Sequence, residues 1–137
     1  MKKLIVLIAF GMLTHSGWSQ NMEVVIKNVD ASDGNIAAAL FSNEADFLKT
    51  RFAAKKVKAN KGEVHLVFEN IPAGKYALSV YHDANTNGEL DKNLMGIPKE
   101  GFGFSNDAMG MFGPPDFKKA SFDWKGEQTI SLALRYY

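Results

Sequence analysis

The chain has 137 residues, of which 46% are hydrophobic, 23% are charged and none is cysteine. That length supports one well-buried core but hardly two, so we expect a single domain. The formal net charge of +1 argues against nucleic acid or an anionic membrane surface as a partner, because both attract a basic field.

The first 19 residues have the features of a secretory signal peptide. Two lysines precede an apolar run at residues 4–13, and small residues follow up to Ser19. The run is too short to cross a bilayer, which takes about 20 apolar residues. Cleavage after Ser19 removes two lysines and changes the net charge from +1 to −1. We therefore expect a periplasmic or secreted protein made of residues 20–137, with no transmembrane segment.

Short apolar alternation broken by turn residues dominates the rest of the chain and predicts an all-β sandwich or barrel. Seven strands are predicted, at residues 24–30, 36–40, 55–58, 63–68, 75–82, 120–124 and 129–137. The Asp33-Gly34 pair between the first two predicts a hairpin. On the fifth strand Leu78, Val80 and His82 share a face, so His82 is expected at the rim of the core.

One segment, from Ser42 to Phe52, loses the period of two. It predicts one short helix with Ser42 as its N-cap. Four lysines follow this segment, at Lys55, Lys56, Lys58 and Lys61. They suit a binding patch or a solvated edge strand, and the pattern favours the edge strand, which lysines protect from pairing with other chains.

A long stretch rich in Gly, Asn, Asp and Pro, residues 83–117, separates the fifth predicted strand from the sixth. Such stretches inside compact domains are usually functional or disordered. Oxygen-bearing side chains alternate along its start, followed by a Gly at the sixth position: the residues concerned are Asp83, Asn85, Asn87, Gly88, Glu89 and Asp91. This is the front half of a calcium loop, in which Gly88 permits the sharp turn and Glu89 offers its carbonyl.

The back half of that calcium loop is incomplete. Its twelfth position, where a Glu should close the site, is Leu94, so Glu100 or Asp116 is needed to complete the ligand set. The alternative is a metal-free turn in which the Asp and Asn side chains bond to nearby backbone amides. Both interpretations stay open. Because calcium prefers oxygen, His82 is expected to orient the loop instead of binding the ion.

Farther along the stretch, Phe102 and Phe104 stand between glycines. They either tuck under the stretch and pin it to the sheets, or form an exposed patch for a ligand or partner. The other members of such a patch are Met109, Met111, Phe112 and Phe117. The pattern favours pinning.

An enzyme is the runner-up interpretation, a hydrolase that uses His82 with a loop carboxylate or Ser105. His82 and Asp83 are neighbours on a strand and point to opposite faces, so they form no direct pair. Ser105, followed by Asn106, has no nucleophile-elbow pattern around it. Only three histidines are present, so a zinc site built from histidines is not expected.

Three motifs in a fixed order resemble a bacterial family. They read IPAGKYA at 71–77, HDANTNGELD at 82–91 and MGIPKEGFGFSN at 95–106. From about Val24 to Tyr136 the chain resembles the domain-of-unknown-function 2141 family (DUF2141), exported proteins of Gram-negative bacteria. The resemblance implies a small periplasmic or secreted β-sandwich whose His-Asp-x-Asn-x-Asn-Gly segment is its hallmark, and it brings no activity.

The approach to that hallmark, F-x-x-I-P-A-G-x-Y at 68–76, is similar to transthyretin-like and carboxypeptidase-regulatory-like sandwiches. Those modules mostly bind or support, so the analogy favours a binding or accessory role. We therefore predict a seven-stranded immunoglobulin- or transthyretin-like sandwich with one short helix and a long functional loop. Its partner is an unidentified ligand or, in a third alternative, a protein of the cell envelope. The residues expected at the loop or its ligand are His82, Gly88, Glu100, Phe102, Phe104, Ser105 and Asn106.

Overall fold

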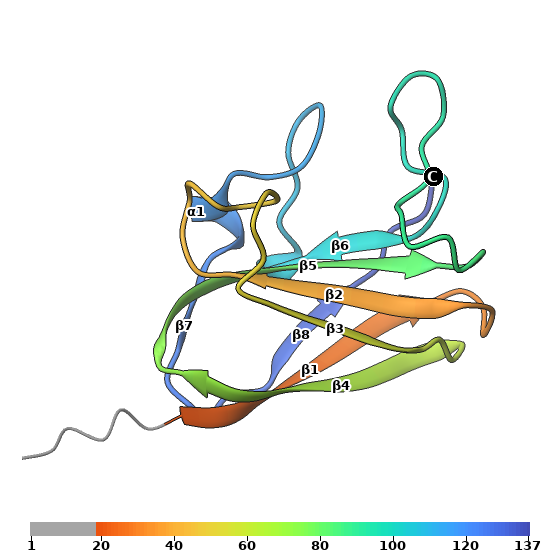
Figure 1. Cartoon of the computed structure of the whole chain (residues 1–137). Helices are drawn as coiled ribbons and strands as arrows, with labels where there is room; N and C mark the ends of the chain where they lie inside the picture. The colour runs from red at the N-terminus through yellow and green to blue at the C-terminus, as the bar shows by residue number, and fades with distance from the viewer. Residues whose placement is uncertain (1–18) are drawn as a thin grey trace, which may run out of the picture.

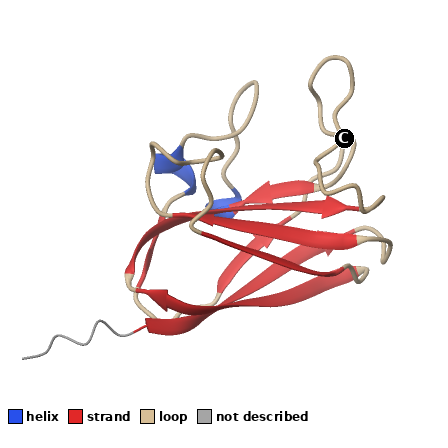
Figure 2. Ribbon diagram, in the orientation of Figure 1, coloured by secondary structure: helices blue, strands red, loops and turns tan. Residues whose placement is uncertain are grey.

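Two β-sheets make up the fold in a computed structural model that describes residues 19–137, so that nearly all of the predicted signal peptide lies outside the described residues (Figures 1 and 2). The first sheet has the order β4 (Gly62–Pro72), β1 (Ser19–Val29), β8 (Ile130–Ala133). The second has the order β3 (Ala53–Lys58), β2 (Asn35–Phe41), β5 (Gly74–Asp83), β6 (Phe102–Phe104), and β7 (Phe122–Trp124) pairs with the start of β5. Two short helices, η1 (Ser105–Asp107) and α1 (Phe117–Ala120), follow β6.

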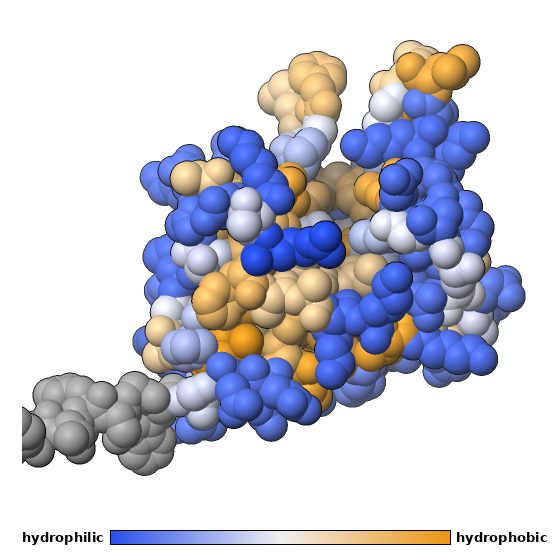
Figure 3. Space-filling view, viewed as in Figure 1, coloured by the Kyte–Doolittle hydropathy of each residue, from blue (hydrophilic) through white to orange (hydrophobic). Residues whose placement is uncertain are grey.

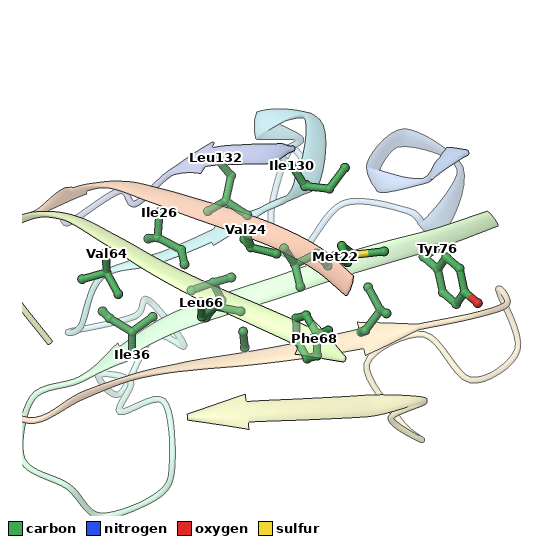
Figure 4. Packing of buried hydrophobic residues seen from close by; sticks show 14 of the residues in the cluster. Met22, Val24, Ile26, Ile36, Val64, Leu66, Phe68, Tyr76, Ile130 and Leu132 are labelled. Atoms are coloured by element: carbon green, nitrogen blue, oxygen red, sulfur yellow. The ribbon is translucent and has the colours of Figure 1, made fainter. Parts of the chain in front are cut away.

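The main core lies between the two sheets (Figure 4). Alternate residues of each long strand point inward, as a period of two requires. Val24, Ile26 and Leu66 from the first sheet face Ile36 and Leu78 from the second, and all five are at most 2% exposed. Burying each such side chain contributes about 1.5–3 kcal/mol, so this layer is the main source of stability.

A second apolar cluster covers part of the outer face of the five-stranded sheet. Phe47 packs edge-on against Phe41 and Phe117, with ring centroids 5.4 and 5.7 Å apart. Phe102 and Phe104 of β6 belong to the same cluster and are 8% and 7% exposed. Their burial agrees with the pinning interpretation, because these rings fasten the stretch after β5 to the sheet.

The predicted hairpin between the first two strands is wrong. β1 pairs with β4 and β8, whereas β2 pairs with β3 and β5. The turn at Gly34, with φ of +68°, carries the chain from one sheet to the other. Both strands have a fully apolar inner face, and the two faces bury more surface when they oppose each other across the core than when they lie side by side.

The helix predicted between Ser42 and Phe52 is also wrong, since this segment forms consecutive turns. Asn43, not Ser42, provides the capping oxygen, which accepts the backbone N–H of Asp46 at 2.9 Å. Leu48 has φ of +59°, and a left-handed residue stops a right-handed helix after a single turn. Within the described residues the α-helix is α1, which follows the Pro114-Pro115 pair.

Residues 19–137 form eight strands where seven were predicted. β6, only three residues long, lies inside the Gly-rich stretch and had no alternation to reveal it. β3 is at an edge of its sheet and Lys55, Lys56 and Lys58 are exposed on it, as the edge-strand interpretation predicts. Lys55 and Lys56 also line the hollow described below.

Candidate functional site

The loop at residues 83–91 leaves the end of β5 and folds back over a buried carboxylate. Asp83 is the last residue of β5 and is 0% exposed. Its Oδ1 accepts the backbone N–H of Asn87 at 3.1 Å, and its Oδ2 accepts that of Gly88 at 2.9 Å. Gly88 has φ of +80°, the left-handed conformation that the motif predicts for its sixth position. Asp83 therefore organises the turn.

The remaining polar side chains of the loop form a ring around Asp91. Its carboxylate accepts the side-chain amides of Asn85 and Asn87 at 2.6 and 2.8 Å. The Asn87 side-chain oxygen accepts the N–H of Glu89 at 3.0 Å. Within residues 19–137 the carbonyl of Glu89 accepts no hydrogen bond. The loop thus brings together the oxygen-bearing groups that the sequence pattern singled out.

Glu100 closes the loop from its far end. Its carboxylate accepts the backbone N–H of Ala84 at 3.1 Å and that of Asp91 at 3.0 Å. Of the two residues predicted to complete the site, Glu100 therefore reaches the loop. Asp116 does not, because it precedes α1 and its carbonyl accepts the amides of that helix.

The ring supports both interpretations of the loop. Its hydrogen bonds are those of a metal-free turn stabilised by Asp and Asn side chains. Within residues 19–137 no three His, Cys, Asp or Glu side chains gather as a metal-binding group. Amide and backbone oxygens nevertheless supply much of the ligand set in loops of this type.

His82 has a different role from the one expected. It is 1% exposed, and its Nε2 lies 2.7 Å from the carbonyl of Asp33. A carbonyl only accepts, so Nε2 carries a proton. Nδ1 lies 3.1 Å from the Tyr136 hydroxyl and 3.4 Å from Oδ1 of Asp30. The hydroxyl in turn accepts the N–H of Asp30 at 3.1 Å. His82 therefore orients the connection between β1 and β2, and not the 83–91 loop as the sequence suggested.

Tyr136 makes this network sensitive to alkaline pH. Burial raises the pKa of Tyr136 from 10 to about 12. The folded protein holds the phenolic proton more tightly than the unfolded chain, so the stabilisation is complete below pH 10 and is lost as the pH rises toward 12. We expect the free energy of unfolding to fall less between pH 10 and 12 in Tyr136→Phe than in the wild type. Urea unfolding followed by Trp124 fluorescence measures it.

Tyr137→Phe is the matched control, because Tyr137 is 74% exposed and its replacement should leave the alkaline loss unchanged. An alkaline loss in Tyr136→Phe equal to that of the wild type would show that the proton on Tyr136 does not contribute.

Ser105 and Asn106 fasten the segment after β6. The Ser105 hydroxyl accepts the N–H of Leu78 at 2.8 Å and donates to the carbonyl of Ala120 at 2.5 Å. The Asn106 amide donates to the carbonyls of Lys119 and Ser121 at 3.1 and 2.8 Å. Both side chains therefore hold the α1 segment against β5.

A hollow on the outer face of the five-stranded sheet was not predicted from the sequence. Its volume is about 250 Å³ and its floor consists of small residues from neighbouring strands (Figure 3). The main lining residues are Ala37, Ala39, Ala54, Ser79, Tyr81, Gly88, Arg51, Lys55 and Lys56. The available signal was the row of small residues at outward positions of β2 and β5, which becomes a floor only once the strands are paired.

Tyr81 joins the hollow to the loop. Its ring lines the hollow, and its hydroxyl donates to the carbonyl of Gly88 at 2.9 Å. Burial, followed by the charge of Asp83, raises the pKa of Tyr81, so the hydroxyl stays protonated and keeps donating. The wall of the hollow therefore includes the loop backbone at Gly88.

Residues 24–131 match the family described as "Uncharacterized protein conserved in bacteria (DUF2141)". The chain belongs to this family. No curated protein and no solved structure matches the chain. The region shared with DUF2141 contains the 83–91 loop, Glu100 and the whole lining of the hollow, whereas Tyr136 lies beyond it. Among residues 19–137 no helix has the length and apolar character needed to cross a membrane.

Proposed function

We propose that this chain is an exported, non-enzymatic binding module in which calcium orders the 83–91 loop and the hollow beside it receives the ligand. In this proposal the two packed sheets are an immunoglobulin- or transthyretin-like sandwich, and the protein acts in the periplasm or after secretion. The observation that carries the proposal is the hydrogen bond from Tyr81 to Gly88, at 2.9 Å, because it makes an ion-binding loop part of a ligand-binding wall.

The loop has the donors that calcium requires. Each carboxylate oxygen of Asp83 has two lone pairs and accepts one backbone N–H. One lone pair on each oxygen therefore remains available to an ion. When the side-chain amides of Asn85 and Asn87 turn over, each presents its oxygen beside Asp91. The turn gives up the bonds that these oxygens accept from the N–H groups of Asn87 and Glu89, and the ion replaces them. With the Glu89 carbonyl, these groups make an all-oxygen set for a hard cation.

The hollow favours a ligand with negative charge. Arg51, Lys55 and Lys56 line it, and within residues 19–137 none of the three has a carboxylate within 4.0 Å. Free cations around an apolar floor attract an anionic group and leave the floor available for a flat apolar surface.

The hydrolase alternative has less support. His82 and Ser105 are each buried and fully hydrogen-bonded. Ser105 bonds to β5 at Leu78, four residues from His82, and four strand residues span about 13 Å. A serine nucleophile needs its base within hydrogen-bond distance.

Thermal unfolding of residues 20–137 with and without calcium tests the proposal. At a dissociation constant of about 0.1 mM, which suffices for extracellular modules, about 5 mM calcium stabilises the native state by about 2.3 kcal/mol. We expect the unfolding midpoint to rise by several degrees relative to the protein in chelator, and magnesium to cause a smaller rise.

Asp91→Asn should lose most of the calcium-dependent rise, since it removes a charged ligand and keeps the side-chain shape. Asp123→Asn is the matched control, because Asp123 is exposed on β7 beside Lys75 and takes no part in the loop. An equal rise in wild type and Asp91→Asn, or no rise in the wild type, would contradict calcium binding at this loop.

A further inference from the structure

Two loops rise from the same side of the molecule and carry large apolar side chains at their tips (Figures 1 and 3). The first tip loop is residues 92–98 and the second is residues 108–115. Leu94 and Met95 of the first are 108% and 84% exposed, and Met111 and Phe112 of the second are 89% and 98% exposed. Exposed apolar side chains usually occur singly, so paired tips of this kind indicate a contact surface.

The first tip loop is held in a fixed shape. The Asn93 side-chain oxygen accepts the backbone N–H groups of Met95 and Ile97 at 2.9 and 3.0 Å. The N–H of Asn93 donates to the carbonyl of Ile97 at 2.9 Å, and Lys92 forms a β-bridge with Pro98 below. Leu94 and Met95 are therefore presented outward by an ordered turn, at a place where polar turn residues are the rule.

The second tip loop is pinched at its base. A Cβ added at Gly110 would lie 2.4 Å from the carbonyl oxygens of Gly113 and Pro114, so only glycine allows the two sides to approach this closely. Met109 before the pinch packs against the outer cluster, and Phe117 after it belongs to that cluster. The pinch leaves Met111 and Phe112 at the point of the loop.

The shape of the tips decides between a protein partner and a lipid partner. A stable protein interface buries at least about 1,000 Å² of continuous, complementary surface, whereas these tips are small, convex and set apart from each other (Figure 1). A bilayer deforms around separate convex tips and takes apolar side chains from each of them.

The charge of the tips also suits lipid. The first tip loop contains Lys92 and is followed directly by Lys99, and the second contains no charged residue. Neither loop contains an acidic residue, and the acidic residues nearest to them, Asp91, Glu100, Asp107 and Asp116, lie at the bases of the loops. Every phospholipid carries a phosphate that a lysine beside an inserted tip can reach. We propose that the two tip loops insert into the surface of a phospholipid bilayer. Apolar side chains drive this insertion, so it does not require a large net positive charge, which the chain lacks.

Co-sedimentation of residues 20–137 with vesicles tests this proposal. Residues 1–19 are left out so that their apolar run adds nothing to the lipid binding that is measured. Vesicles of phosphatidylcholine alone and of phosphatidylethanolamine with phosphatidylglycerol are used, each in calcium and in chelator. We expect the wild type to sediment with both kinds, and the double variants Leu94→Ser with Met95→Ser and Met111→Ser with Phe112→Ser each to bind at least about fivefold more weakly.

Val67→Ser is the matched control, because Val67 is a 37% exposed apolar residue on β4 of the other sheet, and its binding should equal that of the wild type. Phe112→Trp should give a blue-shifted fluorescence that brominated lipids quench. A wild type that stays in the supernatant, or tip variants that bind as well as it does, would overturn the proposal. Self-association that the tip variants abolish, without vesicle binding, would overturn it in favour of a second copy of the chain. Loss of calcium binding alone leaves the sedimentation in chelator unchanged, so the two proposals fail separately.

Discussion

Gly34→Ala is expected to destabilise the protein by about 3 kcal/mol or more, through overpacking and backbone strain together. A Cβ at this position would lie 2.0 Å from the carbonyl oxygen of Asp83 and 2.7 Å from the Cα of Ala84. Both are backbone atoms, so a rotamer change cannot relieve the clash. Gly34 also has φ of +68°, a conformation that alanine rarely adopts. The measurement is urea unfolding monitored by Trp124 fluorescence.

Gly62→Ala separates these two effects. Gly62 has φ of +99° but no atom within 4 Å of an added Cβ, so this variant carries the backbone cost alone, about 1 kcal/mol. The larger loss in Gly34→Ala then measures the close approach between the β1–β2 connection and the start of the 83–91 loop. Equal losses in the two variants would contradict that approach.

Asp83→Ala is the second large effect, with an expected loss of about 2–4 kcal/mol in calcium-free buffer. The substitution removes both acceptors of the Asn87 and Gly88 amides at a position that is 0% exposed. Asp83→Asn keeps one carbonyl oxygen in the same place and should lose about half as much. Urea unfolding gives the stability, and hydrogen exchange at the Gly88 amide reports the loop itself.

The outcome that contradicts this account is faster exchange at Gly88 with unchanged stability, or no change in either quantity. Faster exchange alone would mean that the carboxylate orders the loop without stabilising the fold. No change in either quantity would mean that it neither orders the loop nor stabilises the fold.

The sequence predicted the parts of the fold that rest on local periodicity. Val64, Leu66 and Phe68 share a buried face of β4, and Leu78 and Val80 do so on β5, as their alternation indicates. The pairing of strands was not accessible in this way. Whether β1 lies beside β2 or opposite it depends on how two apolar faces meet in space, and a turn sequence at Gly34 fits both arrangements.

The short elements were predicted wrongly because their conformations, too, depend on contacts with residues far away in the sequence. The turns after Phe41 contain a capping residue and apolar residues one turn apart, which is also how a helix begins. Leu48, however, adopts a left-handed conformation, and its neighbour Phe47 packs in the outer cluster. β6 is strand only because β5 offers it an unpaired edge. Tertiary contacts of this kind override local preference.

Some parts of the candidate site were predictable from the sequence and others were not. The spacing of oxygen side chains located Asp83, Asn85, Asn87 and Asp91 on one loop, and the need for a closing carboxylate singled out Glu100. The hollow, the Tyr81 link and the Tyr136 hydroxyl on His82 join residues from different strands. No motif spans such distances along the chain.

The most direct test of the calcium-ordered loop is a titration of ¹⁵N-labelled residues 20–137 with calcium, followed through the backbone amide signals. We predict saturable movement of the Asn87, Gly88 and Asp91 amides, with a dissociation constant of about 0.1–1 mM, and a smaller accompanying movement at Ala37, Ala39 and Ser79 on the floor of the hollow. Saturable signals at 83–91 that magnesium reproduces only weakly would establish an ion-ordered loop, and accompanying movement at the floor would establish its coupling to the hollow. Signals that stay in place up to about 10 mM calcium, ten times the weakest affinity predicted, would show that the loop is held by its own hydrogen bonds and would contradict the account.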